Sequence, residues 1–451
     1  MAAVVTVAAG GSSLSALGAG QWSANVKDVA ADAADKTKAG ADKTPMSTFG
    51  ETRELKGRRT ERGHIGYLGS STDLNQGYSQ AMYNMSQVNW QTSEDRCKPA
   101  FVFATQKMFA GSFQIRGIQA AENLRQRWVA PCPSDYNELC KYVNSGPECS
   151  CHDILDRSLF VHVKFVCNDL KKSLPNAFHV YDECDTAWQV NPTFQGWDGV
   201  IAAHKLQGEA AVKRSAKQYW SIPHHSIVHC DMMPVPTAQE WGTQVHRILA
   251  MGAAHNEPPR DQMASWAAAV SRQRGVKVEV IYERDYSTQW FNDLGLCPIF
   301  HRNNVTMAIA WQGQMAQTNQ GHNNYKPVER MVNPISLGVP VFLAGSHPGF
   351  QIATEPLSAT DRNSMLVDNV NAMQASIERA IKDYDHWAHL RMAGLQLAKD
   401  YSVTAVGDLY MKMWGDLKGQ REASELRAKN NGTLVGQIYG SNWPNLRALS
   451  T

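Results

Sequence analysis

The sequence predicts an α/β protein with two Rossmann-like, doubly wound domains that face each other across a cleft, preceded by a disordered N-terminal tail. Two observations predict this fold. A chain of 451 residues is too long for one ordinary domain. Short apolar runs typical of buried strands alternate with amphipathic segments of helical periodicity. This alternation is typical of parallel sheets that carry helices on both faces.

The composition suits a protein with substantial cores, because 43% of the residues are hydrophobic and 13 are Trp. The net charge of +2, from 44 basic and 42 acidic residues, gives no bulk attraction to nucleic acid or to membranes. No run of apolar residues is long enough for a membrane-spanning helix. We therefore expect no nucleic-acid partner and no integral membrane span.

Residues 1–60 are predicted to be a disordered or targeting tail. No Lys or Arg precedes the apolar Val4 and Val5, so a secretory signal is poorly formed. Residues 27–43 are biased toward Ala, Asp and Lys, and such a composition buries too little apolar area to offset the entropy of ordering. The compartment stays open between the cytoplasm and the lumen of the secretory pathway.

The first domain is predicted at residues 61–235. It opens with a strand at 99–105, a loop containing Gly111 and Ser112, and an amphipathic helix at 113–128, which together begin a βαβ unit. The later elements of this domain are predicted strands at 159–165, 177–181, 199–203 and 221–225, and predicted helices at 168–173 and 205–216.

Residues 236–274, Pro-rich and then helical, are predicted to connect the domains, and the second domain is predicted at 275–400. Its predicted strands are 276–282, 298–301, 306–310, 340–344 and 366–368, and its predicted helices are 328–337, 370–383 and 386–399. Residues 401–451 are predicted to form a last amphipathic helix, at about 403–418, and a polar tail.

The segment YKPVERMVNPISLGVPVF, residues 325–342, resembles the nucleotide-binding helix and strand of GT-B glycosyltransferases. Further segments that resemble this family follow one another in its order: 111–124, 179–188, 197–211, 222–225 and 366–414. The resemblance implies transfer of a hexose from a nucleotide-diphosphate sugar to a glycan or small-molecule acceptor. It also implies a metal-independent reaction without a resident cofactor, and a last helix that packs back on the first domain.

The sequence departs from many retaining members of that family, which carry two Glu residues eight positions apart. The matching positions here are Tyr325 and Asn333, and Glu329 could substitute for one carboxylate a helical turn earlier. One alternative is therefore a catalytically degenerate glycosyltransferase-like protein that binds or scaffolds. Another is a different enzyme on the same architecture, such as a sugar-phosphate epimerase, because a fold does not fix a function.

The donor site is predicted around the start of the helix at 328–337. A helix N-terminus offers unpaired N–H groups and partial positive charge to a phosphate. Lys326 and Arg330 are four residues apart and would add cationic contacts. The other donor-binding candidates are Gly111, Ser112 and Arg116 from the first domain, and Asn333, Gly345 and His347 from the second.

The catalytic candidates are acidic and imidazole side chains near strand ends. Asp182 and Asp185 follow a predicted strand, where a general base would be useful. His204 follows the predicted strand 199–203, and Glu329 lies in the helix of the predicted donor site. A cluster formed by His224, His225, His229 and Cys230 favours hydrogen bonding along the cleft over a metal site, because its spacing is not typical of metal ligands.

Four cysteines, Cys132, Cys140, Cys149 and Cys151, precede His152. Their gaps do not match zinc-ligand spacing, so free thiols or a disulfide-linked loop are favoured, and disulfides would imply an oxidising compartment. N-glycosylation motifs begin at Asn84, Asn304 and Asn431, a number that chance also yields. No G-x-G-x-x-G follows a predicted strand, which disfavours a dinucleotide oxidoreductase.

Overall fold

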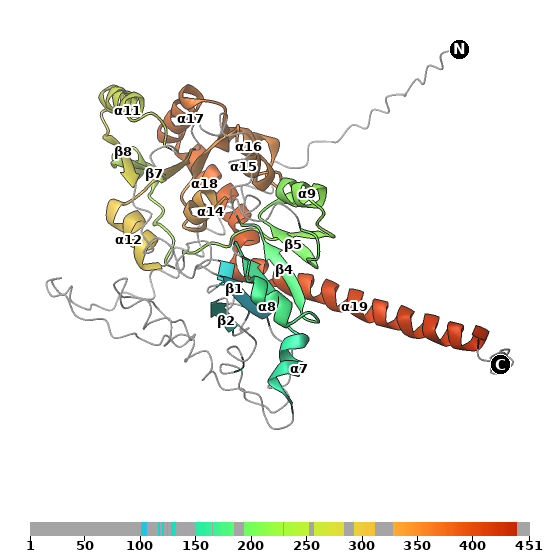
Figure 1. Ribbon diagram of the computed structural model, residues 1–451. Coiled ribbons are helices and arrows are strands. Elements are labelled where there is room, and N and C mark those ends of the chain that lie inside the picture. The colour runs from blue at the N-terminus through green and yellow to red at the C-terminus, as the bar shows by residue number, and fades with distance from the viewer. Residues whose placement is uncertain are drawn as a thin grey trace, which may run out of the picture. The chain divides into compact units, whose positions relative to one another are not determined.

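The structure is a computed structural model. It describes residues 101–105, 128–131, 149–184 except 165, 194–251 except 229, 257–283, 293–311 and 328–439, and the single positions 116, 117, 120, 124 and 140. Two parallel sheets organise these residues (Figure 1), and both belong to one compact unit of the chain. The predicted tail at 1–60 lies outside the described residues.

The first sheet has the strand order β2-β1-β3-β4-β5-β6, and all its neighbouring strands are parallel. The strands are β1 (Phe101–Thr105), β2 (Trp128–Pro131), β3 (Leu159–Val163), β4 (Phe178–Asp182), β5 (Gly199–Ala202) and β6 (Tyr219–Ser221). Every residue of β3, β4 and β5 is buried, as expected for a parallel sheet covered on both faces.

Alternate side chains of the first sheet enter different cores, because successive residues of a strand face opposite sides. Phe103 packs in a cluster with Tyr410 and Trp414 of α19 (Val403–Tyr439). Val102 packs in a second cluster with the helices α7 (Cys151–Asp156) and α8 (Asn168–Ser173). The last helix therefore covers one face of the first sheet, which confirms the packing that the resemblance implied.

The second sheet has the strand order β11-β10-β9-β7-β8 and is also parallel throughout. Its strands are β7 (His246–Met251), β8 (Val278–Glu283), β9 (Met307–Ala310), β10 (Val341–Ala344) and β11 (Leu366–Val367). With the first sheet, it confirms the predicted fold class of two doubly wound α/β domains in succession.

Helices connect the strands of both domains. Beyond α7, α8 and α19, they are α9 (Lys205–Lys213), α10 (Ala238–Trp241), α11 (Arg260–Arg274), α12 (Asp293–Asn303), α14 (Glu329–Ser336), α15 (Pro348–Ala353), α16 (Ala359–Met365), α17 (Val370–Lys382) and α18 (Tyr384–Ala398). Several begin at side-chain caps visible in the sequence, such as Asn369 before α17 and Asp383 before α18.

The end of α14 shows why a glycine is needed there. Gly338 has a φ of 70°, in the left-handed region that glycine adopts without steric cost. The guanidinium of Arg391 occupies the space that a Cβ at this position would need, and it donates a hydrogen bond to the carbonyl oxygen of Gly338. This glycine therefore ends the helical segment just before the next strand.

Two predictions about the second domain were wrong. Residues 298–301 are part of the helix α12, because Cys297, Ile299 and Phe300 are buried on a helical segment, and a run this short does not distinguish strand from helix. Residues 236–274 are more than a connection, because they contain β7, which pairs with both β8 and β9. The second sheet therefore begins about 30 residues before the predicted start of this domain at 275.

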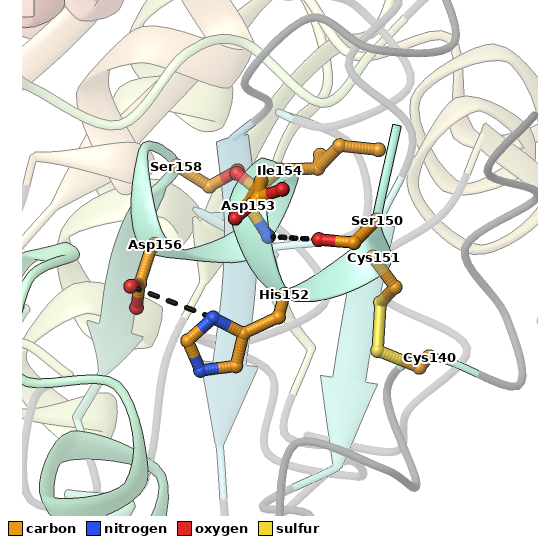
Figure 2. Close-up of a disulfide and its surroundings, with 8 residues drawn as sticks. All are labelled: Cys140, Ser150, Cys151, His152, Asp153, Ile154, Asp156 and Ser158. Carbon is orange, nitrogen blue, oxygen red and sulfur yellow. Dashed lines mark hydrogen bonds and ion pairs between the residues drawn. A yellow bond between two sulfur atoms is a disulfide. The ribbon is translucent and has the colours of Figure 1, made fainter. Parts of the chain in front are cut away.

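Disulfides link several of the cysteines that the sequence left open. Cys140 is bonded to Cys151 at the start of α7, where Ser150 caps the helix by accepting a hydrogen bond from the N–H of Asp153 (Figure 2). Cys230 is bonded to Cys297 of α12, which excludes Cys230 as a metal ligand. Cys149 and Cys167 are disulfide-bonded as well. Of the two alternatives for the cysteines before His152, the disulfide-linked loop is therefore confirmed for Cys140, Cys149 and Cys151.

Among the described residues, no helix is long and apolar enough to cross a membrane. Within the same part of the chain, no group of three or more His, Cys, Asp or Glu side chains is placed to hold a metal ion.

Candidate functional site

A cavity of about 210 Å³ lies between the ends of β5 and β6 of the first sheet and helices of the second domain. From the first domain it is lined by residues that follow β5 and β6, among them His204, Lys205 and His224. From the second domain it is lined by Val328, just before α14, by residues of α15, and by Tyr401. Ligands of open α/β sheets bind outside the carboxyl ends of the strands, so this cavity is the candidate site.

His224 joins the two domains beside this cavity. Its Nδ1 lies 2.7 Å from a carboxylate oxygen of Glu329, the first residue of α14. Its Nε2 lies 3.5 Å from the Sγ of Cys184, which follows β4. An ionised carboxylate can only accept, so Nδ1 of His224 is the donor in the contact with Glu329. His224 is buried, whereas the side chain of Glu329 is 27% exposed, so the carboxylate of this contact keeps access to water.

Glu329 is ionised in this arrangement. Burial opposes its charge, but the attraction and hydrogen bond of His224, a backbone N–H and the charge of Arg330 together lower its pKa from 4.5 to about 2. The Glu329 carboxylate is thus an anion in the first turn of α14. This is where the sequence predicted a phosphate, so any phosphate bound there would meet a negative charge that His224 has to balance.

Cys184 was not identified as a site residue from the sequence. It is fully buried and forms no disulfide, and its φ of 51° is uncommon for a residue other than glycine. Its N–H donates to the Oδ1 of Asp182, two residues earlier. The available signal was its place directly after a strand, next to the predicted Asp182.

Asp182 and Arg116 form a buried ion pair instead of lining the cavity. The Nε of Arg116 donates to the Oδ2 of Asp182 at 2.6 Å, with the two side chains 1% and 0% exposed. The Nη1 of Arg116 donates to the carbonyl oxygen of Ile222, after β6. The pair therefore ties the end of β4 to the chain after β6. Both side chains are buried in this contact, and their predicted roles in donor binding and catalysis stay predictions.

His204 is the predicted catalytic residue that the structure places on the cavity itself. It occupies the N-cap position of α9, where its side chain makes no capping hydrogen bond, and it is 7% exposed. The neighbouring Lys205 forms an exposed ion pair at 2.8 Å with Glu355, which follows α15. The cavity thus has an imidazole on its wall and an ion pair between the domains beside it.

The remaining predicted donor-binding side chains have structural contacts. Arg330 donates to the carbonyl oxygen of Trp311 at 3.3 Å. The Oδ1 of Asn333, a residue that is 4% exposed, accepts from the N–H of Ile227 at 3.2 Å. Asn333 therefore links α14 to the chain that joins the domains.

Gly345 and His347 follow β10. The N–H of Gly345 donates to the carbonyl oxygen of Val367, and a Cβ on Gly345 would lie 3.2 Å from both Val367 and Asp368. His347 caps α15 by accepting from the N–H of Phe350, and it is 2% exposed. The backbone of Gly345 and the imidazole of His347 therefore shape the turn after β10. Their predicted role in donor binding stays a prediction.

Four predicted site residues, Gly111, Ser112, Asp185 and Lys326, lie outside the described residues, as does His229. The predicted phosphate loop of the first domain and the segment that leads into α14 are thus not part of the site geometry given above.

No protein-family model matches the chain, and no curated protein matches it. Solved structures similar to it include S. aureus TarM in complex with fondaparinux, alpha-GlcNAc-glycerol and UDP, at 13% identity and a TM-score of 0.36, covering 57% of this chain and 56% of that one. The pneumococcal O-GlcNAc transferase GtfA in complex with UDP and GlcNAc is similar at 10% identity and a TM-score of 0.36, covering 58% and 57%.

A DNA-modifying beta-glucosyltransferase is similar at 8% identity and a TM-score of 0.40, covering 70% of this chain and 99% of that one. The chain thus matches a little over half the length of TarM and GtfA. The sequence segments described above resemble glycosyltransferases as well. The architecture itself rests on the two parallel sheets and on the packing of α19.

Proposed function

We propose that this chain is a glycosyltransferase that moves a sugar from a nucleotide-diphosphate sugar to a glycan or small-molecule acceptor. The observation that carries the proposal is the cavity lined by the chain after β5 and β6 on one side and by the start of α14 and α15 on the other. A site between two domains allows one domain to hold the donor and the other to hold the acceptor, with both reacting atoms at the boundary.

The departing diphosphate requires electrostatic stabilisation. In this proposal the N–H groups of the first turn of α14 and the guanidinium of Arg330 provide it. Lys326, Gly111 and Ser112 are proposed as further contacts from the sequence. The ion pair of Glu329 with His224 offsets the carboxylate charge in that turn, so that the helix end can accept a second anion.

The acceptor hydroxyl requires a group that takes its proton. We assign this role to His204, because its imidazole lines the cavity at the end of β5. In the step proposed, the acceptor oxygen bonds to the anomeric carbon while the bond from that carbon to the diphosphate oxygen breaks. The proton of the hydroxyl moves to His204, and the nucleoside diphosphate leaves as an anion.

The test is turnover of a panel of nucleotide sugars by the full chain and by His204→Ala, with release of nucleoside diphosphate as the readout. Loss of a general base should lower kcat/KM by roughly 10²–10⁴-fold, with the melting temperature unchanged. The matched control is His152→Ala, which changes an exposed imidazole on α7 and should leave turnover unchanged. Equal turnover by His204→Ala and the parent would remove His204 from the mechanism.

A second candidate function is binding or scaffolding by the same fold without turnover. It is favoured by the volume of the cavity, about 210 Å³, because small-molecule sites usually have about 300–1,000 Å³. It is also favoured by Asn333, which is held in a structural hydrogen bond. Saturable binding of a nucleotide sugar without release of its nucleoside diphosphate, with any acceptor tried, would select this function.

A further inference from the structure

The turn between α12 and β9 carries the motif Asn304-Val305-Thr306. We propose that Asn304 is an acceptor site for an N-linked glycan in the lumen of the secretory pathway. An Asn-x-Thr motif is the acceptor sequence for this modification when it lies at the surface of a protein that enters that lumen. The motif alone occurs by chance, so the proposal depends on two further observations, one on compartment and one on geometry.

The compartment follows from the disulfides. Six of the described cysteines, Cys140, Cys149, Cys151, Cys167, Cys230 and Cys297, are disulfide-bonded. Disulfides persist in secreted proteins and in the lumen of the secretory pathway, and they are rare in the reducing cytosol. One of these bonds holds α12, which ends immediately before Asn304. We therefore place the folded chain in an oxidising compartment, where the glycosylation machinery acts.

The geometry presents Asn304 at the surface. Asn304 is exposed and follows the last residue of α12, with a φ of 45°. Its backbone N–H donates to the carbonyl oxygen of His301, so the backbone of the turn is fixed. Val305 and Thr306, by contrast, are buried. The asparagine is thus the exposed member of the motif, and a glycan attached to it would extend into solvent.

The surroundings of Asn304 give such a glycan a physical effect. Asn304 lines a cavity of about 390 Å³ together with Val235 and Trp387. Val235 is 57% exposed, and the nearby chain position Met232 is 56% exposed. Exposed apolar side chains of this kind favour association between molecules. A hydrophilic glycan at Asn304 would stand at the mouth of this cavity and hinder contact with its apolar lining.

The same two residue types also have an explanation without a glycan. Asn tolerates the left-handed conformation at a helix end better than most residues. The hydroxyl of Thr306 donates to the carbonyl oxygen of Arg247 at 3.1 Å. The test must therefore detect the attached sugar rather than an effect of substitution.

In the transfer proposed, the side-chain amide nitrogen of Asn304 bonds to the first sugar of a lipid-linked oligosaccharide diphosphate. The bond between that sugar and the diphosphate breaks, and the amide proton is lost. This reaction is independent of the proposed glycosyltransferase activity, because Asn304 belongs to the cavity beside Trp387 and not to the one that His204 lines.

The experiment produces the full chain with a secretory leader in a eukaryotic host and digests it with peptide-N-glycosidase in heavy-oxygen water. Release of a glycan converts the glycosylated Asn to a heavy-oxygen-labelled Asp, which mass spectrometry of the peptide assigns to Asn304 rather than to Asn84 or Asn431. We expect most of the Asn304 peptide to carry the label.

Two variants of Thr306 provide matched controls. Thr306→Ser keeps the motif and a hydroxyl for Arg247, so the label should remain. Thr306→Val keeps the size of the side chain and removes the motif, so the label should be lost at Asn304 and kept at any other occupied position. An unlabelled Asn304 peptide from secreted parent chain in which Cys230 and Cys297 are disulfide-bonded would overturn the proposal.

Discussion

The buried pair of Arg116 and Asp182 allows a direct test of whether these residues stabilise the first domain or act on a substrate. Asp182→Asn keeps the shape of the side chain and an oxygen that can accept from the N–H of Cys184. It removes the negative charge 2.6 Å from the guanidinium of Arg116 and puts an amide in its place. The variant therefore leaves an uncompensated charge in the interior.

The expected cost follows from the burial of both groups. With side-chain exposures of 1% and 0%, water cannot solvate the guanidinium that is left behind. Loss of one partner from a buried ion pair costs about 3–5 kcal/mol of the free energy of unfolding. If the first domain unfolds as a unit, this cost lowers its melting temperature by about 6–20 °C. Burial lowers the pKa of Arg116, and in the parent the attraction of Asp182 raises it. Without Asp182 the guanidinium still stays charged at any working pH, because arginine is not deprotonated in proteins.

The assay is a double-mutant cycle with Arg116→Met, read by urea and thermal unfolding. The double variant has no buried charge left, although the carbonyl oxygen of Ile222 loses the donor that Arg116 provides. We expect the double variant to lose less than the two single variants together, with a coupling energy of about 2–3 kcal/mol. Additive losses, or an Asp182→Asn variant that keeps its stability and loses only turnover, would refute the structural role and restore Asp182 as a catalytic candidate.

Two further predictions concern the link between the domains. The pKa of Glu329 is about 2 in the folded chain against an ordinary 4.5. Its pairing with His224 beside Arg330 therefore contributes at most about 3 kcal/mol to the free energy of unfolding above about pH 4.5, and this contribution is lost as the pH falls toward 2. In pH-dependent unfolding, the stability difference between the parent and Glu329→Gln should shrink over that range, and a constant difference would contradict the prediction. The disulfide of Cys230 and Cys297 closes a span of 67 residues. The double variant in which Ser replaces both cysteines should therefore lose about 4 kcal/mol of the free energy of unfolding, measured in urea under oxidising conditions. An unchanged midpoint of urea unfolding would show that the bond does not constrain the chain.

The strands of this fold could be predicted from the sequence because both sheets are parallel and buried. Segments such as 159–163 and 341–344 are short, largely apolar runs, bounded by Ser158 and Lys164 in one case and by Pro340 and Gly345 in the other, and the structure has strands at both. The strand β7 was missed because it follows a Pro-rich segment and its sequence, HRILAM, mixes charged and apolar residues. Its place in the sheet depends on pairing with β8 and β9, and the local pattern of apolar residues cannot predict such pairing.

The candidate site was less predictable, because sequence position does not determine which polar side chain fills which contact. His204 follows its strand as predicted, whereas Asp182 is the last residue of β4, and of the two only His204 lines the cavity. Arg116 could serve a phosphate or a carboxylate equally well by its chemistry. In the structure, Arg116 binds a carboxylate, that of Asp182, which lies 66 residues away in the chain but in contact in the fold. Such long-range pairings decide function and leave no local pattern.

The contacts that cross between the domains differ in strength, and this difference bears on how a donor larger than the cavity would enter. Lys205 and Glu355 are 47% and 48% exposed, and an exposed ion pair of this kind contributes about 0–1 kcal/mol. The hydrogen bond from Ile227 to Asn333 is buried, and breaking it would leave two buried polar groups unpaired at about 1–3 kcal/mol each. Opening the cavity on the side of Lys205 and Glu355 therefore costs less than opening it on the side of Ile227. An enlargement of the cavity from 210 Å³ toward the volume of a nucleotide sugar should thus pivot about the buried contact at Ile227 and separate Lys205 from Glu355.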